Sequence, residues 1–189
     1  MLLLLAVLFV VAITLINRSP EVSAISYSDT LEQTISRAAK LPDDGENGQA
    51  SVSARFRDLW GDLTVEGIDR MIGQVYAEDV WFNDTIKTVT GRDALKEYLH
   101  ETATRVARCR VEVDDIAFSG GNYYVRWRMT VVPHDASESD AWRSTGMTHL
   151  RFNADGQVLM HQDYWDAASG LYEHLPVFGW MMRNIKARL

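Results

Sequence analysis

The alternation of hydrophobic and polar residues divides the chain into a run of helices followed by a run of strands. Apolar residues recur with the helical period of about 3.6 residues in three segments, near residues 51–60, 64–76 and 90–106. Each apolar stripe has the width expected for the core-facing side of a surface helix. A short extended segment, residues 80–89, separates the second and third helices. The residues of these stripes are therefore predicted to form a core rather than to contact a cofactor.

Beyond Cys109 the period of the pattern changes to two, which is the period of a strand. Strands are predicted over residues 111–118, 123–132, 142–152 and 157–165, with turns at 119–122 and 153–156 and an acidic loop at 133–140. A change of phase in the first strand indicates a bulge at Asp114 and Asp115. Helices followed by an antiparallel meander predict an α+β fold in which helices cover one face of an antiparallel sheet.

The last hairpin allows its two faces to be assigned. If its loop holds two or four residues, even-numbered residues of one strand share a face with odd-numbered residues of the other. The more apolar face, which we assign to the interior, would carry Gly146, Thr148, Leu150, Phe152, Leu159, His161, Asp163 and Trp165. The outer face would carry Met147, His149, Arg151, Val158, Met160, Gln162 and Tyr164. A bulge of one residue would reverse this assignment.

On this assignment His161 and Asp163 form a candidate acid/base pair. They lie two residues apart on one face of a strand, about 7 Å along it, beside Thr148. A carboxylate orients a neighbouring imidazole and raises its basicity, so the pair could serve as general base and acid. The alternative is that the two groups only satisfy each other's hydrogen bonds beneath the helices.

In the predicted strand before this hairpin, residues 123–132, apolar and cationic side chains lie on opposite faces. Alternation places Trp127 and Met129 on one face, and Arg126 and Arg128 on the other. We assign the arginines to the outer face. There they are expected to pair with acidic neighbours or to contact a second copy of the chain.

The chain begins with an apolar run, Met1 to Ile16, in which Thr14 is the one polar residue. A membrane-spanning helix needs about 20 apolar residues, so the run is slightly short. We interpret residues 1–18 either as an uncleaved membrane anchor or as a signal segment whose removal leaves a secreted or periplasmic protein. The sequence does not decide on which side of the membrane the rest of the chain lies. Residues 19–50 are predicted to be a polar linker, and a short helix near 29–39 has no evident packing partner.

Composition narrows the choice of partners. Lys and Arg total 19 and Asp and Glu total 26, for a net charge of −7, which disfavours nucleic acid as a partner. Cys109 is the single cysteine, no residue spacing indicates a metal site, and no glycine-rich loop suits a phosphate, so we expect no cofactor. The C-terminal segment, residues 171–189, is basic and amphipathic. It either lies in a membrane interface or forms a lid over the domain.

Several strings, in their order along the chain, resemble a nuclear transport factor 2-like, SnoaL-like domain. They are residues 76–84, 90–95, 152–158 and 161–166, and the resemblance covers about residues 51–170. It implies a cone, in which a strongly curved antiparallel sheet wraps helices around an apolar cavity, and a homodimer through the outer face of the sheet. Relatives such as ketosteroid isomerase, scytalone dehydratase, limonene epoxide hydrolase and polyketide cyclases place a carboxylate or histidine in that cavity.

The resemblance also suggests roles for residues of this sequence. It implies that Asp163, His161 and Asp84 are catalytic, with Asp84 at the cavity mouth. The substrate-binding candidates are Tyr98, Trp127, Met129, Thr148 and Trp165. The expected function is to bind a small apolar, lipid-like molecule at a membrane, with isomerisation, dehydration, cyclisation or epoxide opening as candidate reactions. The alternatives are a non-catalytic binder and a dimeric interaction module whose cavity is plugged by side chains such as Trp127 and Trp165.

Overall fold

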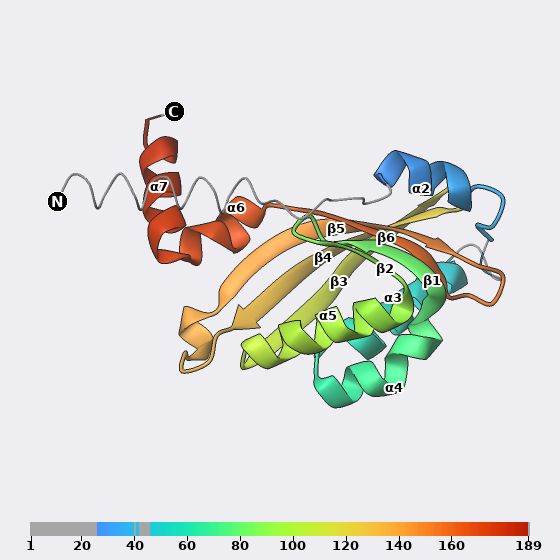
Figure 1. The fold of residues 1–189 in the computed structure, drawn as a ribbon, viewed down its shortest axis with the longest axis horizontal. Coiled ribbons are helices and arrows are strands. Elements are labelled where there is room, and N and C mark those ends of the chain that lie inside the picture. The colour runs from blue at the N-terminus through green and yellow to red at the C-terminus, as the bar shows by residue number, and fades with distance from the viewer. Residues whose placement is uncertain (1–25, 40, 42–45, 189) are drawn as a thin grey trace, which may run out of the picture.

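A curved sheet of six strands forms the centre of the molecule (Figure 1). The computed structural model describes residues 26–39, 41 and 46–188. The strands are β1 (Tyr76–Asn83), β2 (Thr88–Thr90), β3 (Arg108–Ser119), β4 (Asn122–Val132), β5 (Trp142–Phe152) and β6 (Val158–Trp165), and their order in the sheet is β2-β1-β6-β5-β4-β3. The α+β prediction is confirmed. The predicted N-terminal hydrophobic helix falls outside the described residues.

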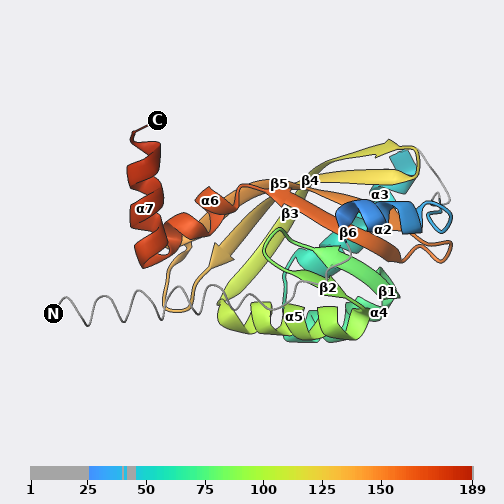
Figure 2. The same cartoon turned by 45° about the horizontal axis from the view of Figure 1, so that its top comes forward.

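Three helices cover one face of the sheet (Figures 1 and 2). They are α3 (Glu46–Trp60), α4 (Val65–Val75) and α5 (Arg92–Arg105). Thr64 caps α4 by accepting a hydrogen bond from the Gly67 backbone N–H (3.1 Å), which satisfies one of the free donors of the first turn. The predicted stripes supply the core, whose buried members include Val52, Phe56, Leu59, Ile68, Ile72, Leu95 and Leu99. Their burial fixes which side of each helix faces the sheet.

The first strand differs from its prediction in its start and in its direction. β1 begins at Tyr76, directly after α4, rather than near Val80. It pairs in parallel with β6, with Phe82 opposite His161, so the expectation of a wholly antiparallel sheet is wrong. The physical reason is that α5 and the four strands β2 to β5 separate β1 from β6 in the chain. No short turn joins the pair, and so nothing local imposes an antiparallel direction.

The register of the antiparallel strands follows the sequence pattern closely. The pairing of β3 with β4 shifts between Val113 and Asp115, which confirms the predicted bulge. In the last hairpin Thr148 pairs with Asp163 and Leu150 with His161, which confirms the predicted faces along most of its length. The exception is at the turn. A second register shift places Val158 opposite Phe152 and in the core, so its assignment to the outer face is wrong.

A further helix, α2 (Tyr27–Thr34), packs on the opposite side of the sheet (Figures 1 and 2). The Tyr27 hydroxyl lies 3.1 Å from His149 Nδ1, and Arg151 Nη1 donates to the Leu31 carbonyl (2.6 Å) and to Thr34 Oγ1 (3.0 Å). The sequence offered no partner for this helix, because the residues it contacts lie more than a hundred positions away. Part of the outer face is therefore covered within one chain, and dimerisation through that face stays a prediction.

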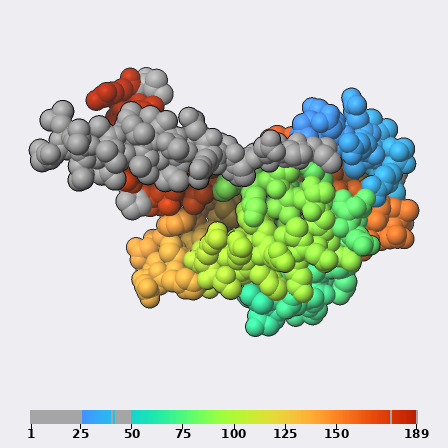
Figure 3. All heavy atoms as spheres, in the orientation of Figure 1, coloured from blue at the N-terminus to red at the C-terminus, as the bar shows by residue number. Residues whose placement is uncertain are grey.

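The C-terminal segment lies at the end of the molecule away from α2 (Figures 2 and 3). It contains the short α6 (Ala167–Gly170), the 3-10 turn η2 (Tyr172–His174) and α7 (Pro176–Lys186), and a second 3-10 turn, η1 (Glu138–Asp140), precedes β5. In the space-filling view α5 lies between α2 and this segment (Figure 3). Gly170 is held close to the sheet, since a Cβ there would meet Ser144 and Trp165 at 2.7 Å.

Candidate functional site

A cavity of about 660 Å³ lies between the inner face of the sheet and the helices α3 and α5. Its walls are mostly apolar and aromatic. They include Phe56, Trp60, Phe82, Leu99, Val111, Trp127, Met129, Val131, Trp142, Trp165 and Leu171. Its polar lining includes Asp84, Tyr98, Thr148, His161 and Asp163. The fold therefore brings all eight site residues named from the sequence to one cavity.

The buried end of this cavity holds the pair His161 and Asp163. His161 Nε2 lies 2.9 Å from Asp163 Oδ1, and the side chains are 1% and 13% exposed. Both project from β6 to the inner face because they are separated by one residue of a regular strand. The carboxylate is thus mostly withdrawn from water but still reaches the cavity.

Two more groups position Asp163 from the neighbouring strands. The Thr148 hydroxyl donates to Asp163 Oδ1 (2.5 Å), and the Trp127 indole N–H donates to Thr148 Oγ1 (2.8 Å). Cross-strand pairing of Trp127 with Gly146, and of Thr148 with Asp163, sets these distances. Thr148 is fully buried, so each hydrogen bond replaces one that water would otherwise supply.

Tyr76 and Trp60 extend the network on the other side of His161. The Tyr76 hydroxyl lies 3.0 Å from His161 Nδ1, and the Trp60 indole N–H donates to the Tyr76 oxygen (3.2 Å). Both residues belong to the apolar stripes of predicted helices, so the sequence pattern does not identify them as site residues. Their apolar surroundings matched a core, and no local signal could relate Tyr76 to a histidine 85 positions later.

The hydrogen bonds of this network determine the tautomer of His161. An ionised Asp163 can only accept, so His161 Nε2 carries the hydrogen and donates to it. Nδ1 then accepts from Tyr76, whose oxygen in turn accepts from Trp60. This assignment satisfies every group with a neutral imidazole. Donors therefore converge on Asp163 Oδ1 from both sides, while no donor among the described residues bonds to Oδ2.

Aromatic rings enclose the His161 imidazole and shield it from water. The ring centre of Phe82 lies 4.6 Å from that of His161, and Phe56 stacks on it with centres 6.1 Å apart and planes at 17°. Burial raises the pKa of Tyr76, and the charge of Asp163 raises it further. Tyr76 therefore stays protonated and acts as a hydrogen-bond donor across the ordinary pH range.

Asp84 lies in a different setting, in the turn between β1 and β2. Its Oδ1 accepts from the backbone N–H groups of Ile86 (2.9 Å) and Lys87 (2.8 Å), and its Oδ2 accepts from the Tyr98 hydroxyl. The Trp165 indole N–H donates to the Asp84 carbonyl (2.7 Å). Both carboxylate oxygens of Asp84 are thus used to fix the turn and the Tyr98 ring, while its backbone carbonyl holds the Trp165 ring. The geometry suits a positioning role better than a free base.

Cys109 also lines the cavity, a position that the sequence pattern does not predict. Burial raises the pKa of its thiol to about 11, with a smaller contribution from the charge of Asp62. The thiol is therefore protonated at neutral pH, and a nucleophilic thiolate is disfavoured.

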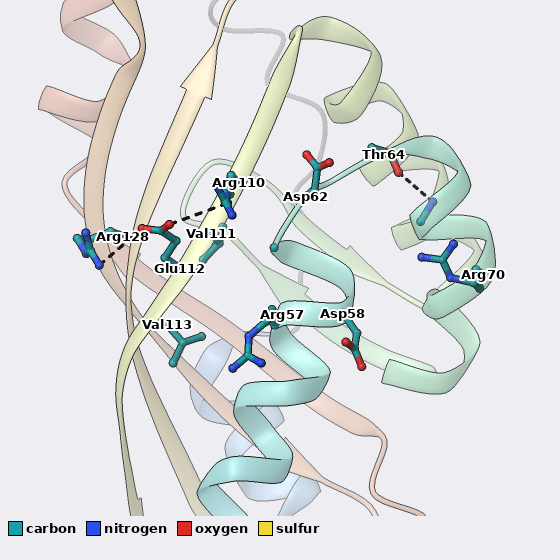
Figure 4. Close-up of a pocket in the computed structure, with 12 residues that line it drawn as sticks. Arg57, Asp58, Asp62, Thr64, Arg70, Arg110, Val111, Glu112, Val113 and Arg128 are labelled. Carbon is teal, nitrogen blue, oxygen red and sulfur yellow. Dashed lines mark hydrogen bonds and ion pairs between the residues drawn. The ribbon is translucent and has the colours of Figure 1, made fainter. Parts of the chain in front are cut away.

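A second hollow, of about 620 Å³, lies between the end of α3, the start of α4 and β3 (Figure 4). It is lined by the arginines Arg57, Arg70, Arg110 and Arg128 and by acidic side chains. Glu112 lies 4.0 Å from Arg110 and 3.6 Å from Arg128, so it offsets part of their charge. These are exposed ion pairs, which contribute little free energy. Of the two hollows, the apolar one contains the buried acid/base pair.

Neither a metal-binding cluster nor a membrane-spanning helix is found in residues 26–39, 41 and 46–188. Within this part of the chain no group of three or more His, Cys, Asp or Glu side chains is arranged to hold a metal ion. No helix within it has the length and apolar character needed to cross a membrane. The apolar run predicted to be an anchor or signal segment lies outside these residues.

Comparison with known proteins identifies the family to which this chain belongs. The family model of the SnoaL-like domain matches residues 53–161, which is more than half of the chain. The chain belongs to the SnoaL-like domain family. No curated protein sequence is detectably similar to it. The family match runs from within α3 to His161 in β6, and it stops two residues before Asp163.

Solved structures share the fold of this SnoaL-like domain at low sequence identity. A protein from Catenulispora acidiphila with a ketosteroid isomerase-like fold, in complex with trimethylamine, is 18% identical with a TM-score of 0.56, over 65% of this chain and 91% of that one. An LEH-like epoxide hydrolase from M. tuberculosis is 12% identical with a TM-score of 0.54, over 73% and 94%. A SnoaL-like family protein from Agrobacterium tumefaciens is 14% identical with a TM-score of 0.51, over 62% and 97%. These similarities establish the fold alone.

Proposed function

We propose that this SnoaL-like domain binds a small apolar molecule in its cavity and catalyses proton transfer on it, with Asp163 as the general base. The observation that carries the proposal is the asymmetry of the Asp163 carboxylate. Oδ1 is held by the Thr148 hydroxyl and the His161 N–H, whereas Oδ2 accepts no hydrogen bond within the described part of the chain. A base needs this combination of a fixed orientation and one free oxygen next to the substrate.

In the proposed step a proton passes from a C–H or O–H group of the substrate, or from a water molecule, to Asp163 Oδ2. The electron pair of the broken bond stays on the substrate or on the attacking oxygen. The protonated carboxyl then returns the proton to another atom. Isomerisation, dehydration, cyclisation and epoxide opening share this requirement for a base in an apolar cavity, and the proposal covers this group of reactions.

The roles of the other residues follow from their contacts. His161 is proposed to orient Asp163 and to stabilise its negative charge by donating from Nε2. Trp127 and Met129 are proposed to contact the apolar body of the substrate, and Trp165 and Tyr98 to shape the cavity around it. A packed, ligand-free module is disfavoured because Trp127 and Trp165 border a cavity of about 660 Å³ instead of filling it.

We also propose that the apolar run of residues 1–18 either anchors the protein in a membrane or directs its export. The run supports this proposal by its composition alone. N-terminal sequencing of the mature protein distinguishes the two forms, because a cleaved signal leaves a new N-terminus beyond residue 18. An intact N-terminus in the membrane fraction supports the anchor.

The function is tested on the full chain in two steps. Native mass spectrometry with organic extraction identifies a co-purifying apolar molecule, which is then incubated with the protein in D2O and followed by mass for deuterium uptake and product. Asp163→Asn keeps the shape of the side chain but removes the base. We expect a loss of turnover of about 100-fold or more with ligand affinity little changed. Asp155→Asn, at an exposed turn residue, is the matched control.

The outcomes separate the alternatives. Equal turnover by wild type and Asp163→Asn would exclude Asp163 as the base. Binding by both proteins without turnover by either would support a non-catalytic carrier. Folded protein that holds no molecule in its cavity would contradict the proposed function altogether.

A further inference from the structure

The helix α7 is oriented with its cationic side toward the protein. Lys186 Nζ pairs with the Glu173 carboxylate and approaches Ser169 Oγ (3.4 Å), and Arg183 Nη1 donates to the Glu173 carbonyl (3.2 Å). Gly179 is buried on the same side, because a Cβ there would meet the Glu173 carbonyl oxygen at 2.1 Å. Gly179, Arg183 and Lys186 are spaced by four and three residues, so they share one face of the helix.

The opposite face of α7 is apolar and lacks a cover within the described part of the chain. Val177 is 75% exposed, Trp180 65%, Phe178 52%, Ile185 47% and Met181 42%. A helix of a soluble domain normally turns such a face to the core. Large apolar side chains gathered on one exposed surface indicate a binding surface. Figures 1 and 2 show α7 standing away from the sheet.

We propose that this outward face of α7 docks on the surface of an anionic phospholipid bilayer. The sequence from Leu175 to Arg188 contains three cations and no acidic residue, in a chain whose net charge is −7. A charge asymmetry of this kind matches the negative surface of anionic lipids. Aromatic and aliphatic side chains on one face, with Arg183 and Lys186 on the other, are the pattern of a helix that lies in the interface.

A bilayer fits this surface better than a second copy of the chain. The apolar side chains project from a single convex helix, and a flat, deformable surface can receive them without a complementary groove. The apolar run of residues 1–18 provides an independent reason to expect a membrane close to the domain.

Docking of α7 would place the cavity next to the lipid. Gly170 and Leu171, which lead into η2, line the cavity, as does Trp142. The Trp142 ring stacks on His174 with centres 4.7 Å apart and planes at 10°, which ties the start of β5 to this segment. An apolar molecule could then pass between bilayer and cavity without crossing water. This inference concerns where the protein docks, and it does not depend on proton transfer by Asp163.

The test uses the full chain reconstituted in vesicles, with a nitroxide label on Phe178→Cys in a Cys109→Ala background. Vesicles of phosphatidylcholine alone are compared with vesicles that contain about 25% phosphatidylglycerol. We expect the label at position 178 to gain access to dissolved oxygen in the anionic vesicles, and its access to a water-soluble nickel complex to fall severalfold. A label on Asp155→Cys, at the exposed turn after β5, is the control and should stay accessible to water in both.

A second pair of variants separates docking from folding. Ile185→Glu places a negative charge on the proposed surface, whereas Ile35→Glu changes an isoleucine that is 64% exposed and lies outside α7. We expect the first variant to restore access of the nickel complex at position 178, and the second to leave it low. Water-like accessibility at position 178 in anionic vesicles would overturn the proposal. Spin–spin broadening between copies in detergent would overturn it in favour of a protein partner.

Discussion

The hydroxyl of Tyr76 lies 3.0 Å from Nδ1 of His161, although 85 positions separate the two residues in the sequence. Parallel pairing of β1 with β6 brings them together. By donating to Nδ1, Tyr76 leaves the hydrogen of the neutral imidazole on Nε2, where it meets Asp163. A residue at the junction of a helix and a strand therefore sets the protonation pattern of the candidate site.

Replacement of Tyr76 by Phe should disturb the hydrogen bonds around His161 without leaving a cavity, because the ring is kept. The substitution leaves His161 Nδ1 and the Trp60 indole N–H unsatisfied in a buried place, which costs about 1–3 kcal/mol of unfolding free energy. Urea denaturation measures this loss. The 15N chemical shifts of His161 should also show that Nδ1 has lost its donor. Tyr172→Phe, at an exposed ring, is the control, and equal stability of the two variants would contradict the proposed role of Tyr76.

Thr148 should tolerate Ser but not Val. Valine keeps the shape of threonine but cannot accept from Trp127 or donate to Asp163. We expect Thr148→Val to lower the free energy of unfolding by about 1–3 kcal/mol and to weaken catalysis, and Thr148→Ser to retain most of both. Chemical denaturation and the turnover assay measure the two effects. Similar behaviour of Val and Ser would show that the hydroxyl is not needed.

Gly146 should be required for the shape of the cavity. A Cβ at this position would meet the Trp127 ring at 2.5 Å and the Trp165 Cβ at 2.8 Å, so Gly146→Ala must displace a cavity-lining ring. We expect a loss of about 1–3 kcal/mol in stability and weaker binding of an apolar fluorescent probe.

Gly73→Ala is the matched control for this change. A Cβ at Gly73 has nothing within 4 Å, and the residue lies in α4. Alanine should therefore stabilise the helix by up to about 1 kcal/mol, because it reduces the freedom of the unfolded chain. Thermal denaturation of both variants tests the contrast. The account of Gly146 fails if the two variants shift stability in the same direction.

His149 should make the stability of the domain depend on pH. Burial, together with the charge of Arg151, lowers its pKa in the folded protein to about 4, compared with 6.5 for an ordinary histidine. Below pH 6.5 the unfolded chain binds a proton that the folded protein does not. Stability contributed by the neutral histidine is thus complete above pH 6.5 and is lost as the pH falls toward 4. The loss from this group is at most about 3 kcal/mol.

Urea denaturation at pH 7.5 and pH 5 measures this effect. His149→Gln removes the titrating group and should flatten the dependence between these pH values. His134→Gln, at an exposed histidine, should leave the dependence as in wild type. A wild-type protein that is equally stable at both pH values would contradict the prediction.

The sequence predicted those features whose cause is local. The period of the apolar residues predicted the three helices of the core and the strands of the meander. Parity within one hairpin predicted that Thr148, His161 and Asp163 share a face, because side chains alternate along a strand and the turn sets the register. The predicted bulge at Asp114 was visible as a change of phase. Each of these features depends only on residues that are close together in the chain.

Features that depend on distant parts of the chain could not be predicted in this way. Tyr76 and Trp60 were assigned to helix stripes, since a residue that donates a buried hydrogen bond has the same apolar neighbours as a core residue. No packing partner for α2 is evident in the sequence, because Arg151 and His149, which hold it, follow it by more than a hundred residues. The parallel direction of β1 was missed for the same reason.

The sequence by itself thus determined the class of fold, the family resemblance and the strand that carries His161 and Asp163. Only the tertiary structure decided that the Thr148 hydroxyl from β5 and the His161 N–H converge on one oxygen of Asp163, and that the apolar face of α7 points outward. The physical reason is the range of the interactions. Periodicity and turns act over a few residues, whereas a hydrogen-bond network and an exposed surface are set by which elements the folded chain brings together.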